Sequence, residues 1–150
     1  MHRLVEGRKL FLGGVEIPYI KGLFGHSDAD VLLHAICDAL LGALGMGDIG
    51  EHFPDTDPQY QGIASVRLLE NVGNFLKTHG YLIHHIDTII IAQEPNLSPF
   101  KQLIRGSIAD ILHIPLGNVN IKAKTNEGLD DIGNREAIAA YAAVTLYKGA

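Results

Sequence analysis

The spacing of hydrophobic and polar residues divides the chain into extended and helical segments. Two short extended runs flank Gly13-Gly14 within residues 9–19, which is the pattern of a β-hairpin. Residues 81–93 are rich in β-branched side chains and predict a strand, and the run Ile89–Ile91 suggests burial on both faces of that strand. Residues 118–125 alternate between apolar and polar side chains and predict another strand.

Other segments have the three- and four-residue spacing of apolar side chains that is typical of amphipathic helices. Helices are predicted over residues 27–44, 65–80, 98–113 and 135–148, and loops over residues 51–62 and 126–134. We expect Ser27 to be the N-cap of the first helix, with Asp30 as a capping carboxylate three residues later, and Ser65 to cap the second. Helices that alternate with strands after a hairpin predict an α+β fold, with one mixed sheet and the helices stacked on one of its faces.

The composition fits one globular domain over residues 1–150 and narrows the classes of partner. A total of 12 Lys and Arg against 17 Asp and Glu gives a net charge of −5, which argues against binding to nucleic acid or an anionic membrane. The chain is 47% hydrophobic, without an apolar run near the roughly 20 residues of a membrane helix. Because only 19% of the residues are charged, we expect an oligomer to bury part of the surface. The single cysteine, Cys37, excludes an intrachain disulfide and is expected to be inert packing in a reducing compartment.

A polar stripe runs along the first predicted helix. Asp30, His34 and Asp38 recur at four-residue intervals, which places them on one side of the helix. His34 is either a hydrogen-bonded core residue or a metal ligand, and His2 is a natural second ligand if the N-terminal strand lies across this helix. Capping explains Asp30, whereas Asp38 either orients an imidazole or is solvated.

Three further groups of polar residues are candidates for ligand binding. His26 and Ser27 sit where the predicted helix begins, so the segment either binds a phosphate or makes an ordinary cap. The acidic residues of the loop near residue 55 either bind sugar or polyol hydroxyls or form turns. Glu127 follows a strand beside Thr125, where a carboxylate could hold a second metal ion.

Three stretches together resemble one family. They are residues 7–58, which contain SDADVLLHAICD, residues 92–99, AQEPNLSP, and residues 122–133, KAKTNEGLDDIG. These motifs resemble the 2-C-methyl-D-erythritol 2,4-cyclodiphosphate synthases of the non-mevalonate isoprenoid pathway, and the resemblance covers nearly the whole chain. It implies an α+β homotrimer with its sheets around a central cavity and three active sites, each between two subunits.

The resemblance also implies the residues of the site. A divalent metal, usually zinc, would be held by His2 and His34, and a second divalent ion, Mg or Mn, by Glu127. His26 and Thr125 match the residues that position the reacting phosphates. The implied erythritol-binding residues are Ser27, Asp48, Ile49, Gly50, Phe53, Pro54, Asp55, Thr56 and Asp57. The implied cytidine-binding residues are Ala92, Gln93, Glu94, Pro95, Asn96, Leu97, Ser98, Lys124 and Thr125.

The chain departs from the family pattern at three places. The family's Asp ligand, two residues before the first histidine, would fall at position zero, so we expect a shortened first strand that lacks one metal ligand. Asn96 replaces the basic residue often found beside the proline of the cytosine pocket. Arg135 lies one place later than the arginine of the common form.

The activity that the resemblance implies is the cyclisation of 4-diphosphocytidyl-2-C-methyl-D-erythritol 2-phosphate, with release of CMP, by a phosphorus–oxygen lyase. Two alternatives stay open: a metal-dependent phosphohydrolase, or an inactive trimer that binds isoprenoid diphosphates. We expect a bacterial cytoplasmic protein, or a plastid stromal one after removal of a transit peptide. Docking to the cytidylyltransferase of the pathway is a further expectation.

Overall fold

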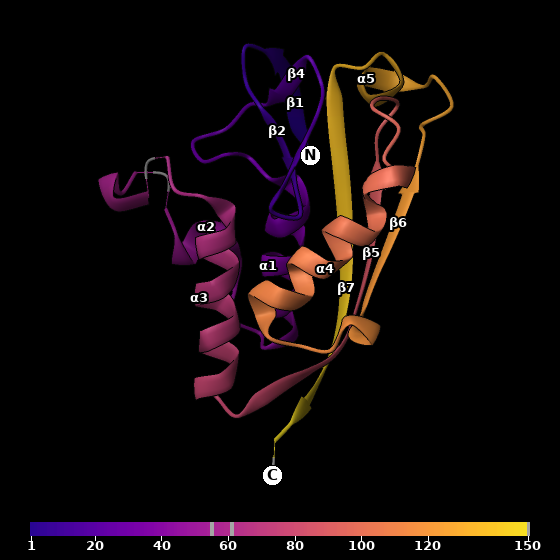
Figure 1. The fold of residues 1–150 in the computed structure, drawn as a ribbon. Helices are drawn as coiled ribbons and strands as arrows, with labels where there is room; N and C mark the ends of the chain where they lie inside the picture. Colours follow the sequence, from indigo (N-terminus) through magenta and orange to yellow (C-terminus); the bar gives the residue numbers. More distant parts are fainter. Residues whose placement is uncertain (55, 61, 150) are drawn as a thin grey trace.

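The computed structural model describes residues 1–54, 56–60 and 62–149, and within them five strands form a mixed sheet in the order β4-β1-β7-β5-β6 (Figure 1). Strands β5 and β6 are parallel, and the other pairs are antiparallel. The strands span His2–Glu6 (β1), Lys21–Leu23 (β4), Tyr81–Ile91 (β5), Val119–Lys124 (β6) and Ala137–Lys148 (β7). Strands β2 (Leu10–Leu12) and β3 (Val15–Ile17) pair as the predicted hairpin around Gly13-Gly14.

The three long helices lie on one side of the sheet (Figure 1). They are α1 (Val31–Ala43), α3 (Ser65–Thr78) and α4 (Lys101–Leu112), and α2 (Ile49–His52), α5 (Asp130–Gly133) and the 3₁₀ turns η1 (Pro58–Tyr60), η2 (Ser98–Phe100) and η3 (Leu116–Asn118) are short. Helix α1 packs on β7 and α3, and α4 covers β6. The predicted α+β fold is therefore confirmed. None of the helices in the described part of the chain has the length and hydrophobicity that a membrane span needs.

Helix α1 is the centre of the hydrophobic core. Its side chains Leu32, Leu33, Ile36 and Leu40 are fully buried, because the helix lies between the sheet and α3 and is apolar on most sides. Burial of one such side chain contributes about 1.5–3 kcal/mol of stability. The residues at the ends of α1 are therefore held on a rigid element.

The prediction of a helix over residues 135–148 is wrong, since this segment forms the long strand β7. Alanine favours helices, but pairing with β5 along most of its length and with β1 at its start decides the conformation. Ile138, Ala140 and Ala142 face the core beneath α1, and Tyr141 and Tyr147 project from the opposite face. The small alanines allow α1 to approach the sheet closely.

The predicted helix starts also need correction. Asp30 caps α1 by accepting from the amides of Leu32 and Leu33, and the helix begins four residues after Ser27. Ser65 is the first residue of α3, which follows Ala64 without a side-chain cap. Residues 130–133, expected to be loop, form α5.

Strand β5 is not buried on both of its faces within one chain. Ile90 is fully buried beneath the helices, whereas Ile89 and Ile91 on the opposite face are partly exposed.

Candidate active site

The first candidate site centres on two histidines from separate elements. Strand β1 lies beside β7, on which α1 packs, so that His2 meets His34. Their rings are edge-to-face with centroids 5.3 Å apart, and His2 Nε2 lies 3.1 Å from His34 Nδ1. The structure therefore brings together the two side chains that the sequence suggests as ligands of one metal ion.

The other ring nitrogen of His34 faces α3. His34 Nε2 lies 2.8 Å from Ser65 Oγ and 3.4 Å from Ser27 Oγ. Ser65 Oγ in turn makes a short hydrogen bond to the carboxylate of Asp28. Asp38 does not orient this imidazole but accepts from the amide of Ile49 at 2.8 Å, which fixes the start of α2.

These histidines open onto a cleft of about 370 Å³ between the start of α1, α2 and the loop before α3. Its lining comprises His2, Gly25, His26, Ser27, His34, Ile49, Gly50, Phe53, Tyr60, Ile63 and Leu68. Of the residues expected to bind the erythritol moiety, Ser27, Ile49, Gly50 and Phe53 line this cleft. The apolar side chains of Phe53, Tyr60, Ile63 and Leu68 give it a partly apolar wall.

The remaining residues of the expected erythritol loop lie outside this lining. Asp48 caps α2 by accepting from the Glu51 amide at 3.0 Å. Asp57 forms a turn, since its amide donates to the Pro54 carbonyl. Thr56 is exposed, and Asp55 lies outside the described residues.

His26 and Ser27 do not form the predicted helix N-terminus. Because α1 begins at Val31 and Asp30 occupies its first amides, backbone donors of the helix are not directed at the cleft. The turn is instead held by Arg8, whose Nη1 donates to the Gly25 carbonyl at 3.0 Å and whose Nη2 donates to the Ser27 carbonyl at 2.6 Å.

A second cavity of about 250 Å³ lies where the parallel strands β5 and β6 end. It is lined by Ala92, Gln93, Glu94, Pro95, Asn96, Leu97, Ser98, Ala123, Lys124 and Thr125. All nine residues expected to bind cytidine are among these. The loop contains a cis peptide before Pro95, and Asn96 Oδ1 accepts from the Ser98 amide at 3.0 Å.

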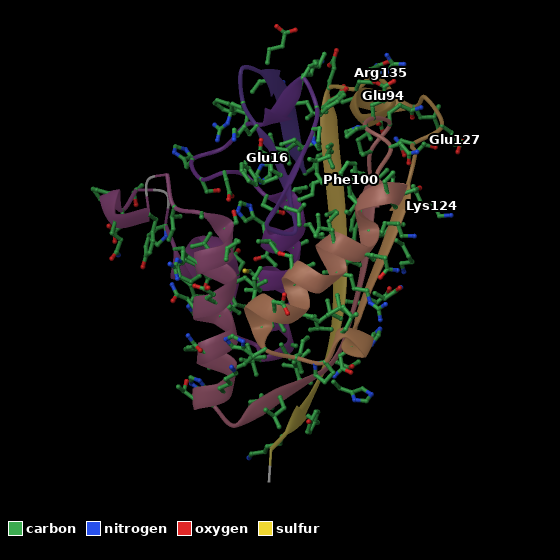
Figure 2. All side chains as sticks on the ribbon, viewed as in Figure 1. Glu16, Glu94, Phe100, Lys124, Glu127 and Arg135 are labelled. Atoms are coloured by element: carbon green, nitrogen blue, oxygen red, sulfur yellow. The ribbon has the colours of Figure 1, made fainter. Side chains whose placement is uncertain are left out.

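Side chains around this cavity are linked to neighbouring loops. Glu94 pairs with Arg135 at 3.2 Å and accepts from the Tyr19 hydroxyl at 3.5 Å, and Glu94 and Arg135 lie together in Figure 2. Burial, and next the Glu94 carboxylate, raise the pKa of Tyr19 above its ordinary value. Thr125 Oγ1 donates to Glu127 Oε1 at 2.9 Å, on the loop after β6.

The residues of the expected site are distributed over the two cavities. His26 lines the first and Thr125 the second, so one chain does not bring the two expected phosphate-positioning residues together. Among residues 1–54, 56–60 and 62–149, no group of three or more His, Cys, Asp and Glu side chains is arranged to hold a metal ion. His2 and His34 would need a further ligand.

Sequence reasoning missed three side chains that hold this site: Arg8, Asp28 and Ser65. Asp28 lies two residues after His26, but its contact with Ser65 spans 37 residues and no local pattern indicates it. The contacts of Arg8 with the Gly25 and Ser27 carbonyls span 17 and 19 residues, so no local pattern indicates them either.

The comparison with known families decides the assignment, since residues 1–147 match the model of the YgbB family. The chain belongs to this family. A 2-C-methyl-D-erythritol 2,4-cyclodiphosphate synthase of Alkaliphilus metalliredigens is 58% identical over 146 residues, which are 97% of this chain and 92% of that protein. A solved 2C-methyl-D-erythritol-2,4-cyclodiphosphate synthase in a CDP-bound form is 36% identical, with a TM-score of 0.90 over 97% of this chain and 95% of that one. The bifunctional IspDF of Campylobacter jejuni is 41% identical, with a TM-score of 0.94 over 98% of this chain, which spans 40% of that longer chain.

These relatives confirm the predicted family, fold and class of enzyme. The chain is an enzyme of the cyclodiphosphate synthase class, a phosphorus–oxygen lyase of the non-mevalonate isoprenoid pathway. Membership of the family also implies dependence on a divalent metal, without deciding between zinc, magnesium and manganese.

Proposed function

We propose that this chain cyclises 4-diphosphocytidyl-2-C-methyl-D-erythritol 2-phosphate to 2-C-methyl-D-erythritol 2,4-cyclodiphosphate. An oxygen of the 2-phosphate attacks the β-phosphorus, a new P–O bond forms, and the bond to the CMP oxygen breaks so that CMP leaves. The observation that supports this most is the pair of cavities, one beside two histidines and one formed by all the expected cytidine residues. The CDP-bound relative supports a cytidine diphosphate substrate.

The two histidines fit a zinc ion. Two nitrogen ligands of a tetrahedral ion, each about 2.05 Å from the metal, lie about 3.3 Å apart, and His2 Nε2 and His34 Nδ1 are separated by 3.1 Å. When bound, such an ion neutralises charge on the phosphoryl oxygens.

The protein side chains then bind and orient the phosphates. We infer that His26 and Ser27 hold one phosphate on the turn that Arg8 braces, and that Lys124 and Thr125 hold the diphosphate beside the cytidine loop. Glu127, next to Thr125, suits a second divalent ion, Mg or Mn. The attacking phosphate oxygen is already anionic near neutral pH, so no nucleophilic serine or cysteine is needed. Holding the two phosphates in line lowers the barrier by up to about 7–11 kcal/mol.

A site shared by two subunits of a homotrimer accounts for the division between cavities. Strands β1 and β6 are separated by β7 and β5, which is about 14 Å at the usual strand spacing. Reacting phosphates must approach within about 3.5 Å. The exposed face of the sheet, where Tyr141 is 63% and Tyr147 50% exposed, supports burial against other subunits around a central cavity.

The decisive experiment incubates the purified chain with the linear substrate and divalent metal, and follows phosphorus NMR and CMP release. We expect the cyclic diphosphate and CMP from the wild type, and neither from His34→Ala. His79→Ala, an exposed histidine at the end of α3, is the matched control and should keep full activity. CMP together with a linear methylerythritol bisphosphate and no cyclic product would favour the phosphohydrolase, and no CMP from a metal-loaded trimer would favour the binding protein.

Two accompanying measurements test the assembly. Sedimentation should give a trimer, and a monomer with full activity would contradict the shared site. The match to part of a bifunctional IspDF chain supports docking to the cytidylyltransferase, which a binding measurement with that enzyme checks.

A further inference from the structure

A chain of hydrogen bonds runs from α3 to the double-histidine cleft. Ser65, the first residue of α3, is completely buried. Its hydroxyl lies 2.8 Å from His34 Nε2 and makes the short hydrogen bond to Asp28 Oδ1. The Ser65 amide also donates to both oxygens of Asp28, at 3.2 and 3.1 Å. The carboxylate of Asp28 therefore accepts hydrogen bonds from both the hydroxyl and the backbone amide of Ser65.

The direction of each hydrogen bond follows from the donors present. An ionised carboxylate has no proton to give, and the amides of Ser65 and Asp30, which contact Asp28, can only donate. The hydroxyl proton of Ser65 is thus directed to Asp28, and the serine oxygen presents its lone pairs to His34. His34 Nε2 must then carry a hydrogen and donate to Ser65.

This arrangement decides the state of the other ring nitrogen. A neutral imidazole with a proton on Nε2 has a lone pair on Nδ1. In His34 that nitrogen is the one 3.1 Å from His2 Nε2. The opposite tautomer would place a hydrogen where a shared cation has to bind.

We propose that Ser65 and Asp28 are positioning residues that keep His34 protonated at Nε2, and so turn the Nδ1 lone pair toward His2 and a shared divalent cation. The cation itself rests on the proposed function, whereas the tautomer does not. Partners that orient a ligating histidine typically change metal affinity about 10- to 100-fold when they are removed.

The first test is the nitrogen-15 NMR spectrum of the histidine rings in the metal-free chain. The wild type should show His34 as the Nε2–H tautomer. Ser65→Ala should give a mixture. Asp28→Ala should raise the Nδ1–H population, because the serine hydroxyl is then able to donate to His34 Nε2. Asp28→Asn keeps an oxygen that accepts from the hydroxyl and should restore the wild-type tautomer.

The second test is zinc affinity, measured by competition with a coloured chelator. Ser65→Ala and Asp28→Ala should bind zinc about 10- to 100-fold more weakly than the wild type. Ser107→Ala on α4, away from the cleft, is the matched control and should be unchanged. If Ser65→Ala fails to fold, the comparison of Asp28→Ala with Asp28→Asn decides the matter.

The outcomes separate this inference from the proposed function. An Nδ1–H tautomer in the wild type, or identical tautomers and zinc affinities in wild type and Asp28→Ala, would overturn the positioning role. A wild type that shows the expected tautomers but binds no zinc would overturn the proposed zinc site, and the response to Asp28→Ala would still support the positioning role.

Discussion

The buried carboxylate of Asp30 offers the sharpest test of the forces in this fold. It is completely buried and accepts from four backbone amides, those of Gly13, Gly14, Leu32 and Leu33, at 2.7–3.2 Å. It thereby joins the turn of the hairpin to the start of α1. Burial raises its pKa to about 6 against the opposing effect of the amide donors.

The perturbation is Asp30→Asn, which removes the titration and keeps one acceptor oxygen. Each unit of difference between the pKa in the folded state and the pKa in the unfolded state changes the free energy of unfolding by about 1.4 kcal/mol. A rise from 3.8 to about 6 therefore corresponds to a total of about 3 kcal/mol. Because the folded pKa is raised, the stabilisation from protonation is complete below about pH 4 and is lost as the pH rises through 6. The asparagine also places an NH₂ group against amide donors, which costs about 1–3 kcal/mol at every pH.

The assay is urea unfolding of both proteins between pH 4 and 7.5. The free energy of unfolding of the wild type minus that of Asp30→Asn should fall by about 2.5 kcal/mol over this range, because the unfolded carboxyl is already partly ionised at pH 4. Groups common to the two proteins cancel in this difference. A difference that stays constant, or that grows as the pH rises, would refute the reasoning, because the four amides would then outweigh the cost of burial.

Three further changes test the site and the sheet. Arg8→Lys should lower kcat/KM for CMP release about 10-fold, since a hydrogen bond from a charged group is worth about 1.5 kcal/mol or more, and leave zinc affinity unchanged. Gly133→Ala places a Cβ 2.1 Å from the Gly128 carbonyl carbon, so the loop with Glu127 must shift and turnover should fall about 100-fold while the chain stays folded by circular dichroism. Ala142→Leu should cost about 1–3 kcal/mol in urea unfolding, and an unchanged midpoint would contradict the packing of α1 on β7.

Local patterns predicted those elements whose structure local interactions decide. The hairpin follows from Gly13-Gly14, whose φ angles of 64° and 77° suit glycine, and α1 follows from its apolar spacing. Strand β7 could not be predicted in this way. Its alanines favour a helix, and its conformation depends on pairing with β5 and β1, which lie far away in the sequence.

The predicted start of α1 differs from the observed one for a related reason. Ser27 and Asp30 are both good caps by residue type. The choice between them is made by Ala29, which adopts a left-handed φ of 57°, and by the hairpin amides that Asp30 also binds. A residue in that conformation interrupts a helix, and only the tertiary structure supplies the contacts that compensate its cost of about 1–2 kcal/mol.

The candidate site shows the same division between local and distant interactions. The cytidine loop is a continuous segment, so its residues line one cavity as their order in the sequence suggests. The support of His34 depends on Asp28 and Ser65, which meet only because α1 and α3 pack together. Resemblance to a family identifies side chains that touch the substrate, whereas the side chains that orient them are found from hydrogen bonds between elements. Predictions of activity from motifs therefore need the packing of α1 against α3 and β7, because that packing sets which nitrogen of His34 faces Ser65 and which faces His2.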